Sequence, residues 1–384
     1  MKKKRATSSL ARPPFKFGSK LVILVCAVLF LLAFLRLHFQ TTLQSVISFY
    51  QASRVFGDDH FKCTPKIAFL FLARRNLPLD FLWGTFLKNV DTSMFSIYVH
   101  SEPGFVFNES NTRSAFFYGR QLNNSIQVEW GESSMIEAER LLFEAALDDP
   151  ANQRFVLLSD SCIPLYSFGY VYSYLTSSSK SFVDSFIDVK ENRYSPEMSP
   201  VIPKEKWRKG SQWIALIRRH AVIVVDDDFV FPVFRKFCKR WPPADLIKRR
   251  QILQAFVFQN GHNCIPDEHY VQTLLKMSGL ENELERRTLT YSLWNQSAEA
   301  GERRSWHPFR FNHADASPQL IQDIKVINHV YYDSENRKEL CHVNITIAPC
   351  FLFARKFTPL AAVRLLTERS VDLQDAASVF HAAP

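Results

Sequence analysis

The feature that most constrains the fold is a series of short apolar runs separated by segments with helical periodicity. Short continuous apolar runs are typical of strands that are buried on both faces of a sheet. Between them, Leu79–Val90 and Met135–Leu147 read as helices with a buried face. Strands that alternate with helices indicate an α/β domain around a mostly parallel central sheet. The strands predicted in this half of the chain are Lys66–Leu72, Phe95–His100, Ile126–Trp130 and Phe155–Leu158.

Polar and aromatic side chains stand at the ends of several of these predicted strands. In a parallel sheet, ligands bind beyond the carboxyl ends of the strands. We therefore expect a binding site at that rim. The side chains expected near it are His100, Glu102, Trp130, Glu132 and Asp160.

The second half of the chain is less regular. A basic loop that contains two tryptophans spans Lys204–Trp213. Helices are predicted at Ser167–Leu175, Lys248–Phe256 and Pro359–Leu366, and strands at Phe182–Ile187 and His220–Val225.

The N-terminal residues predict a membrane anchor. Residues 1–20 are basic, and the unbroken apolar run Leu21–Leu35 follows them. This run is short for a spanning helix, but flanking cations can snorkel to the interface. Because positive charge keeps its side of the membrane cytosolic, we expect a cytosolic tail at 1–20, a transmembrane signal anchor at 21–39, a lumenal stem at 40–62, a folded domain at 63–366 and a flexible tail at 367–384. A cleaved signal peptide and a buried core helix are the alternatives.

Cysteines and glycosylation sequons favour the secretory pathway. Of the seven cysteines, Cys26 lies in the apolar run and the other six follow it, with no CxxC pair that would suggest a zinc site. Disulfides form in an oxidising lumen, where N-glycosylation also occurs. Much of the net charge of +9 comes from the basic N-terminal tail, so a nucleic-acid partner is not expected. The N-glycosylation sequons begin at Asn108, Asn123, Asn295 and Asn344.

The segment Pro266-Asp267-Glu268 has the chemistry of a catalytic base. Proline suits the first turn of a helix, and acidic residues there are favoured by the helix dipole. The apolar residues of Val271–Leu275 give the following helix a buried face. Glu268 would then be a carboxylate on a rigid support, as a general base requires. A plain capped helix start is the alternative reading.

Several motifs in order along residues 65–366 resemble the core-2/I-branching β-1,6-N-acetylglucosaminyltransferase-like family, in its plant form. They are IAFLFLARRNLPL, SIYVHSEPG, FYGRQL, VEWGESSMIEAERLL, RFVLLSDSCIPLYSFGYVYSYL, WRKGSQW, PDEHYVQTLL and CFLFARKF. The resemblance implies a GT-A-like fold, a type II Golgi membrane protein, and transfer of a sugar from a UDP-sugar with inversion. It also implies that Glu268 is the base that takes the proton of the acceptor hydroxyl.

The resemblance further implies that cationic side chains, and no metal, neutralise the UDP leaving group. Lys356 matches the family lysine, Arg355 is a plausible second cation, and Arg337 or Lys338 a third. Val99, His100 and Glu139 are the remaining nucleotide candidates. For the acceptor sugar, an aromatic ring beside polar groups is a suitable platform, and the loop can also be a plain basic surface. The acceptor candidates are Lys206, Trp207, Gln212, Trp213 and Asp160.

Three questions stay open at this stage. Asp226-Asp227-Asp228 contains the Asp-x-Asp pattern of metal-dependent transferases, although a solvated turn is the preferred reading. Ser101-Glu102 stands where the animal enzymes have an aspartate, so the donor, expected to be UDP-N-acetylglucosamine, could instead be UDP-glucuronic acid or UDP-xylose. A non-catalytic lumenal glycan-binding protein of the same fold is the remaining alternative. The expected partners are the UDP-sugar, a glycan or glycoprotein acceptor, and the membrane.

Overall fold

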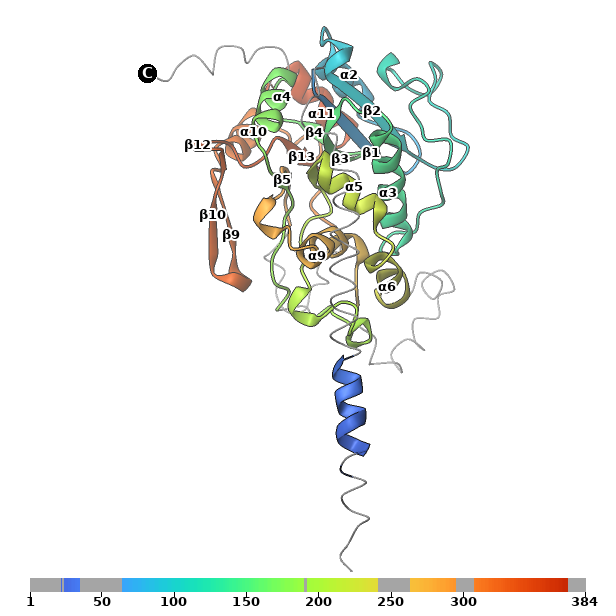
Figure 1. The fold of residues 1–384 in the computed structure, drawn as a ribbon. Helices are drawn as coiled ribbons and strands as arrows, with labels where there is room; N and C mark the ends of the chain where they lie inside the picture. The colour runs from blue at the N-terminus through green and yellow to red at the C-terminus, as the bar shows by residue number, and fades with distance from the viewer. Residues whose placement is uncertain are drawn as a thin grey trace, which may run out of the picture. The chain divides into compact units, whose positions relative to one another are not determined.

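The structure is a computed structural model (Figure 1). It describes residues 22, 24–34, 64–189, 192–240, 263–294 and 307–371. The chain divides into two units, Met1–His60 and Phe61–Pro384. In the first unit, residues 24–34 are helical. No helix among the described residues is long and apolar enough to cross a membrane. The predicted anchor at residues 21–39 lies partly outside the described residues, and the predicted stem lies outside them up to Cys63.

The described part of the second unit is built on a six-stranded sheet with the order β2-β1-β3-β6-β5-β7. β6 is antiparallel to both of its neighbours, and the other pairs are parallel. The prediction of a mostly parallel sheet is therefore confirmed. Leu72 pairs with both His100 and Ser159, so the carboxyl ends of β1, β2 and β3 reach the same edge. The strands are β1 Lys66–Leu72, β2 Phe95–His100, β3 Asn152–Ser159, β5 Ser181–Phe182, β6 Ala215–Ile217 and β7 Leu284–Glu285.

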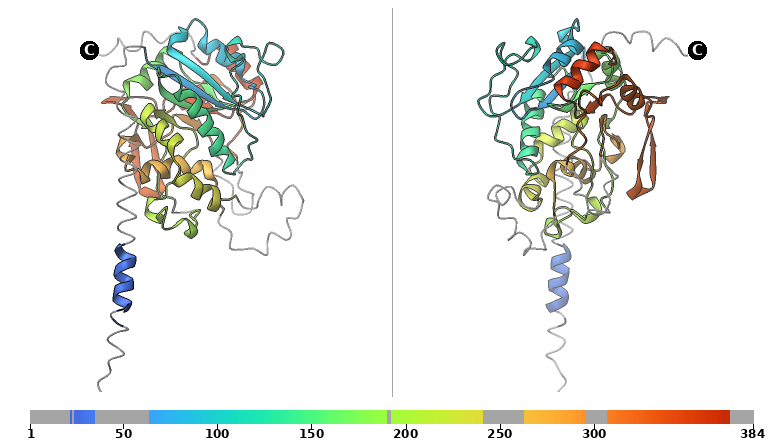
Figure 2. Two further views of the ribbon diagram at one scale, coloured as in Figure 1. Left: turned by 45° about the vertical axis from the view of Figure 1, so that its right-hand side comes forward. Right: turned by 180° about the vertical axis from the view of Figure 1, so that it is seen from behind.

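Helices pack on both faces of this sheet (Figure 2). Side chains alternate between the faces of a strand, so Phe69 and Phe71 join the core that contains residues of α2 and α4, whereas Leu70 joins the core that contains residues of α3 and α5. This explains why β1 is apolar at successive positions. The helices are α2 Asp80–Leu87, α3 Ser134–Leu147, α4 Phe168–Ser177, α5 Arg218–Asp226, α6 Val230–Phe237, α9 Tyr270–Met277, α10 Pro318–Lys325 and α11 Pro359–Thr367.

Smaller sheets and two disulfides complete the described part of the domain. A three-stranded sheet has the order β4-β13-β8, and two hairpins pair β9 with β10 and β11 with β12. Disulfides join Cys238 to Cys264 and Cys341 to Cys350, which confirms that some of the cysteines pair. The strands are β4 Ile163–Pro164, β8 Thr290–Ser292, β9 His329–Tyr332, β10 Arg337–Leu340, β11 His342–Val343, β12 Thr346–Ile347 and β13 Phe353–Arg355.

Two predicted strands are wrong. Ile126–Trp130 is irregular chain, because a side chain replaces a strand partner: the backbone N–H of Ile126 donates to Nε2 of His100 at 3.1 Å. His220–Val225 belongs to helix α5, since His220, Ala221 and Val224 are buried at helical spacing.

Other predicted elements are shorter or undescribed. The sheet strand predicted at Phe182–Ile187 ends at Phe182, and Phe186 makes an isolated bridge with Lys209. The helix predicted at Lys248–Phe256 lies outside the described residues.

Candidate active site

A large cleft of about 1830 Å³ opens at the carboxyl end of β1 and β3. Leu72 and Asp160 line it at those strand ends. Glu268 and Lys356, from distant parts of the sequence, line the same cleft. The predicted base and the predicted leaving-group cation therefore share one cavity.

Glu268 is positioned by a tight approach of three chain segments. It ends a 3-10 turn, Pro266–Glu268, and helix α9 begins after it at Tyr270. The backbone N–H of Gly210 donates to the carbonyl of Glu268 at 2.9 Å. A Cβ atom at Gly210 would lie 1.8 Å from the carbonyl oxygen of Asp184, so only glycine fits. The glycine of the WRKGSQW motif thus brings the loop onto the acidic turn.

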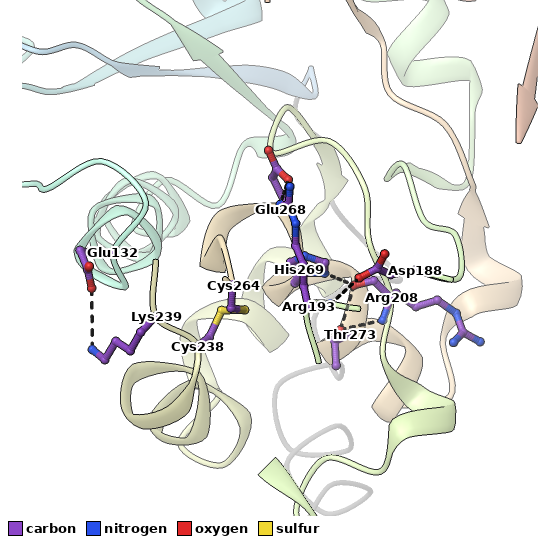
Figure 3. The surroundings of a disulfide bond; sticks show 10 residues. All are labelled: Glu132, Asp188, Arg193, Arg208, Cys238, Lys239, Cys264, Glu268, His269 and Thr273. Carbon is purple, nitrogen blue, oxygen red and sulfur yellow. Dashed lines mark hydrogen bonds and ion pairs between the residues drawn. A yellow bond between two sulfur atoms is a disulfide. The ribbon is translucent and has the colours of Figure 1, made fainter. Parts of the chain in front are cut away.

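The acidic turn carries two carboxylates with different surroundings. Glu268 Oε2 accepts a hydrogen bond from Arg193 Nη1 at 2.6 Å, in a partly buried ion pair. Asp267 is 8% exposed, and burial, followed by the charge of Glu268, raises its pKa to about 7. Figure 3 shows Arg193 and Glu268 near the Cys238–Cys264 disulfide, which ties the start of this segment to the end of α6. Arg193 was missed, because no motif in the sequence marks it.

The cleft also contains a cationic group of residues. Arg355, at the end of β13, places its guanidinium 4.3 Å from the ring centroid of Trp213 and donates through Nε to Ser159 Oγ at 3.3 Å. Burial lowers the pKa of Lys356 to about 8, and the charges of Arg355, Arg310 and Arg74 act in the same direction, against that of Asp160.

Arg310 and Arg74 also line the cleft, and neither was predicted as a site residue. A bridge between Phe311 and Phe357, with the backbone N–H of Phe311 donating to the carbonyl of Lys356 at 2.8 Å, holds the Arg310 segment beside Lys356. No sequence motif marks Arg310, because its place beside Lys356 depends on this long-range pairing.

The predicted nucleotide residues are not all in the cleft. Val99 and His100 are buried and absent from its lining, and burial lowers the pKa of His100 to about 4. Glu139 is also buried, and it accepts a hydrogen bond at 2.7 Å from Gln212 Nε2, which does line the cleft. Burial raises the pKa of Glu139 well above its ordinary value.

Lys338 and Arg337 do not lie where the third cation was expected. Lys338 is exposed on β10 and lies outside the cleft lining. Arg337 forms ion pairs with Glu335 and Glu339. Their placement leaves Arg310 and Arg74 as the additional cations near Lys356.

The acceptor candidates divide in the same way. Gln212, Trp213 and Asp160 line the cleft, and Asp160 pairs with Arg74 at 3.3 Å. Lys206 does not line it.

Trp207 is placed in the core, which corrects the expectation of a sugar platform. Its ring is stacked on Phe234 and on His269, with centroid distances of 5.3 and 4.4 Å, and 3% of the residue is exposed. Trp130, which was expected at the rim, lines the cleft. Tyr291 and Trp294 also line it and were not predicted, and Trp294 is 46% exposed.

The Asp226–Asp228 segment is outside the cleft lining. Asp227 caps α6: its carboxylate accepts hydrogen bonds from the backbone N–H groups of Phe229, Val230 and Phe231 and from the hydroxyl of Tyr270. Its oxygens are thus used for structure.

Among the sequons, Asn108, Asn123 and Asn344 are exposed, and Asn295 lies outside the described residues.

Comparisons with known proteins agree on one family. The Core-2/I-Branching enzyme family model matches residues 67–325. The chain is 55% identical over 302 residues to "Glycosyltransferase BC10" of Oryza sativa subsp. japonica, with 78% of this chain and 76% of that protein covered. A crystal structure of an active-site mutant of LgtC is 10% identical, covers 75% of this chain and 86% of its own, and has a TM-score of 0.32, too low to bear on the fold. The chain belongs to the core-2/I-branching enzyme family, and it is a glycosyltransferase.

Proposed function

We propose that this glycosyltransferase transfers a sugar, N-acetylglucosamine in the first instance, from a UDP-sugar to a glycan or glycoprotein acceptor, with inversion and without a metal ion. The observation that carries the proposal is the presence of Glu268 and of the Arg355–Lys356 pair in one cleft. An inverting transfer needs one base at the acceptor hydroxyl and positive charge at the leaving group.

Each residue has a distinct part in this reaction. Glu268 takes the proton of the acceptor hydroxyl while that oxygen attacks the anomeric carbon and the bond from that carbon to the diphosphate oxygen breaks. Arg193 holds the Glu268 carboxylate in one orientation through its 2.6 Å contact. Lys356, Arg355 and Arg310 face the negative charge that develops on the departing UDP.

Arg355 is well suited to this task because its position is fixed. Ser159 and the ring of Trp213 hold its guanidinium in place before any ligand binds. A preorganised cation stabilises developing charge without reorganising during the reaction.

The cleft also offers contacts for an acceptor sugar. Gln212 presents an amide whose nitrogen is held by Glu139. Trp294 presents an exposed aromatic ring at the lining of the same cleft. A ring face beside polar groups suits a sugar, which has an apolar face and hydroxyls at its edge.

We further propose that the protein acts in the lumen of the Golgi as a single-pass type II membrane protein. The basic residues 1–20, the apolar run that follows, the two disulfides and the exposed sequons at Asn108, Asn123 and Asn344 support this location.

The test uses the full chain, produced in a secretory pathway and purified in detergent. UDP release is measured with UDP-N-acetylglucosamine, UDP-glucuronic acid and UDP-xylose, with and without excess chelator and with a mixed glycan acceptor. We expect turnover of one donor, unchanged by the chelator and lost in Glu268→Gln. Turnover abolished by the chelator would support a metal-dependent transferase instead. Glycan binding with no turnover of any donor would indicate a non-catalytic binding protein.

A further inference from the structure

Asp267 has a buried carboxylate that the protein itself does not fully satisfy. It lines the cleft and is 8% exposed, and its Oδ1 has no hydrogen-bond partner among the described residues. Leaving a buried oxygen of a carboxylate without a donor is costly, and such groups in native proteins call for an explanation.

Asp227 shows what a structural aspartate looks like in the same molecule. It is equally buried, at 8% exposed, but it accepts hydrogen bonds from three backbone N–H groups and from the hydroxyl of Tyr270. Asp267 has no comparable set of partners among the described residues. The contrast indicates that the missing donor of Asp267 comes from a ligand in the cleft.

The charges that act on Asp267 show which groups of the proposed reaction are near it. The charge of Glu268 raises its pKa, whereas the charges of Arg193 and Arg355 lower it. Glu139, on α3, is close enough for the charge of Asp267 to raise the pKa of Glu139. Asp267 thus lies within electrostatic range of Arg193, which pairs with Glu268, and of Arg355, which precedes Lys356. In an in-line transfer, the sugar that moves occupies the space between the base and the diphosphate.

We propose that Asp267 binds the transferred sugar by accepting a hydrogen bond from one of its ring hydroxyls, and so helps to select the donor. The inference rests on the proposed function, and it names a residue for the donor sugar where that function names only the base and the cations. A sugar hydroxyl fits the site because it can donate a hydrogen bond to the unpartnered Oδ1 of Asp267. A site built around such a bond rejects a donor that lacks the hydroxyl, because the carboxylate is then left unpaired.

The test pairs a change in the protein with a change in the donor. The donor is the UDP-sugar that the wild-type chain turns over fastest among the three named above, together with its singly deoxygenated analogues. For the wild type, we expect one analogue to lose about 10- to 100-fold in kcat/KM. Asp267→Asn should lose a similar factor with the intact donor. With that one analogue, kcat/KM of Asp267→Asn should be close to that of the wild type, because the hydrogen bond is already absent in both cases.

Asp227→Asn is the matched control. We expect it to lower the thermal unfolding temperature while leaving the ranking of the deoxygenated donors unchanged. Binding of UDP to Asp267→Asn, measured by calorimetry, checks that this variant is folded.

Two results would overturn the inference while leaving the proposed function intact. One is a wild-type enzyme that uses every deoxygenated donor within about twofold of the intact one, which can be measured whether or not the variant folds. The other is a result in which Asp267→Asn lowers kcat/KM by the same factor for the intact donor and for every deoxygenated analogue. A wild-type chain that turns over no donor at all would instead refute the proposed function, and this inference with it.

Discussion

Lys356 gives the sharpest prediction, because its side chain changes charge near physiological pH. Burial lowers the pKa of its ammonium group to about 8, with Arg355, Arg310 and Arg74 adding to the effect and Asp160 opposing it. A lysine is charged below its pKa and neutral above it. The charge that holds the diphosphate is therefore present at neutral pH and is lost as the pH rises through about 8.

The magnitude follows from the titration. With a pKa of about 8, roughly nine-tenths of the empty enzyme carries the Lys356 charge at pH 7 and roughly one-tenth at pH 9. If only the charged form binds, the apparent Kd for the UDP-sugar should rise about tenfold between these pH values. The diphosphate of a UDP-sugar is fully ionised across this range, so its charge does not change between these pH values.

The assay is calorimetric binding of the UDP-sugar to the purified chain at pH 7, 8 and 9. Lys356→Arg is the control, since arginine stays charged throughout the range. We expect the tenfold weakening in the wild type and a flat profile in Lys356→Arg. A flat wild-type profile, or the same weakening in both proteins, would refute the assignment of Lys356 to the diphosphate.

Further predictions test the supports of the site. Arg193→Met should lower kcat about tenfold or more, because the base loses its orientation, while the Kd for UDP stays within twofold; a wild-type kcat would show that Arg193 has no positioning role. Gly210→Ala should destabilise the fold by about 3 kcal/mol, since its Cβ would lie 1.8 Å from the carbonyl of Asp184. Gly169→Ala, where a Cβ meets no atom within 4 Å, is the control and should not destabilise in thermal or denaturant unfolding. Asp227→Ala should cost about 2 kcal/mol of stability and leave the kcat of the folded enzyme unchanged, and a loss of kcat would revive the Asp-x-Asp segment as part of the site.

The strands β1, β2 and β3 of the first half were predictable because their signals are local, whereas the strand expected at Ile126–Trp130 is irregular chain. Lys66–Leu72 is apolar at successive positions because both faces of β1 are buried, and this alone identifies a central strand. The same reasoning was wrong for His220–Val225. A short apolar segment looks alike in a strand and in a buried helix, and its packing against α3 decides the outcome.

The candidate site was only partly predictable for a related reason. Glu268 and Lys356 stand in motifs, so their sequence neighbours identify them. Arg193 and Arg310 act through contacts with residues far away in the chain, which a single sequence does not reveal. For Trp207 the local sequence was misleading. A tryptophan in a basic loop resembles a sugar platform, but the ring of Trp207 is stacked on Phe234 and on His269 in the core.

In the proposed reaction, Glu268 acts on the acceptor hydroxyl and has little part in holding the nucleotide. The most direct measurement compares the wild type with Glu268→Gln in the rate of sugar transfer and, in parallel, in the Kd for UDP. We expect a loss of transfer of about 100-fold or more, with the Kd for UDP within a few-fold of wild type. Transfer at the wild-type rate by Glu268→Gln would contradict it.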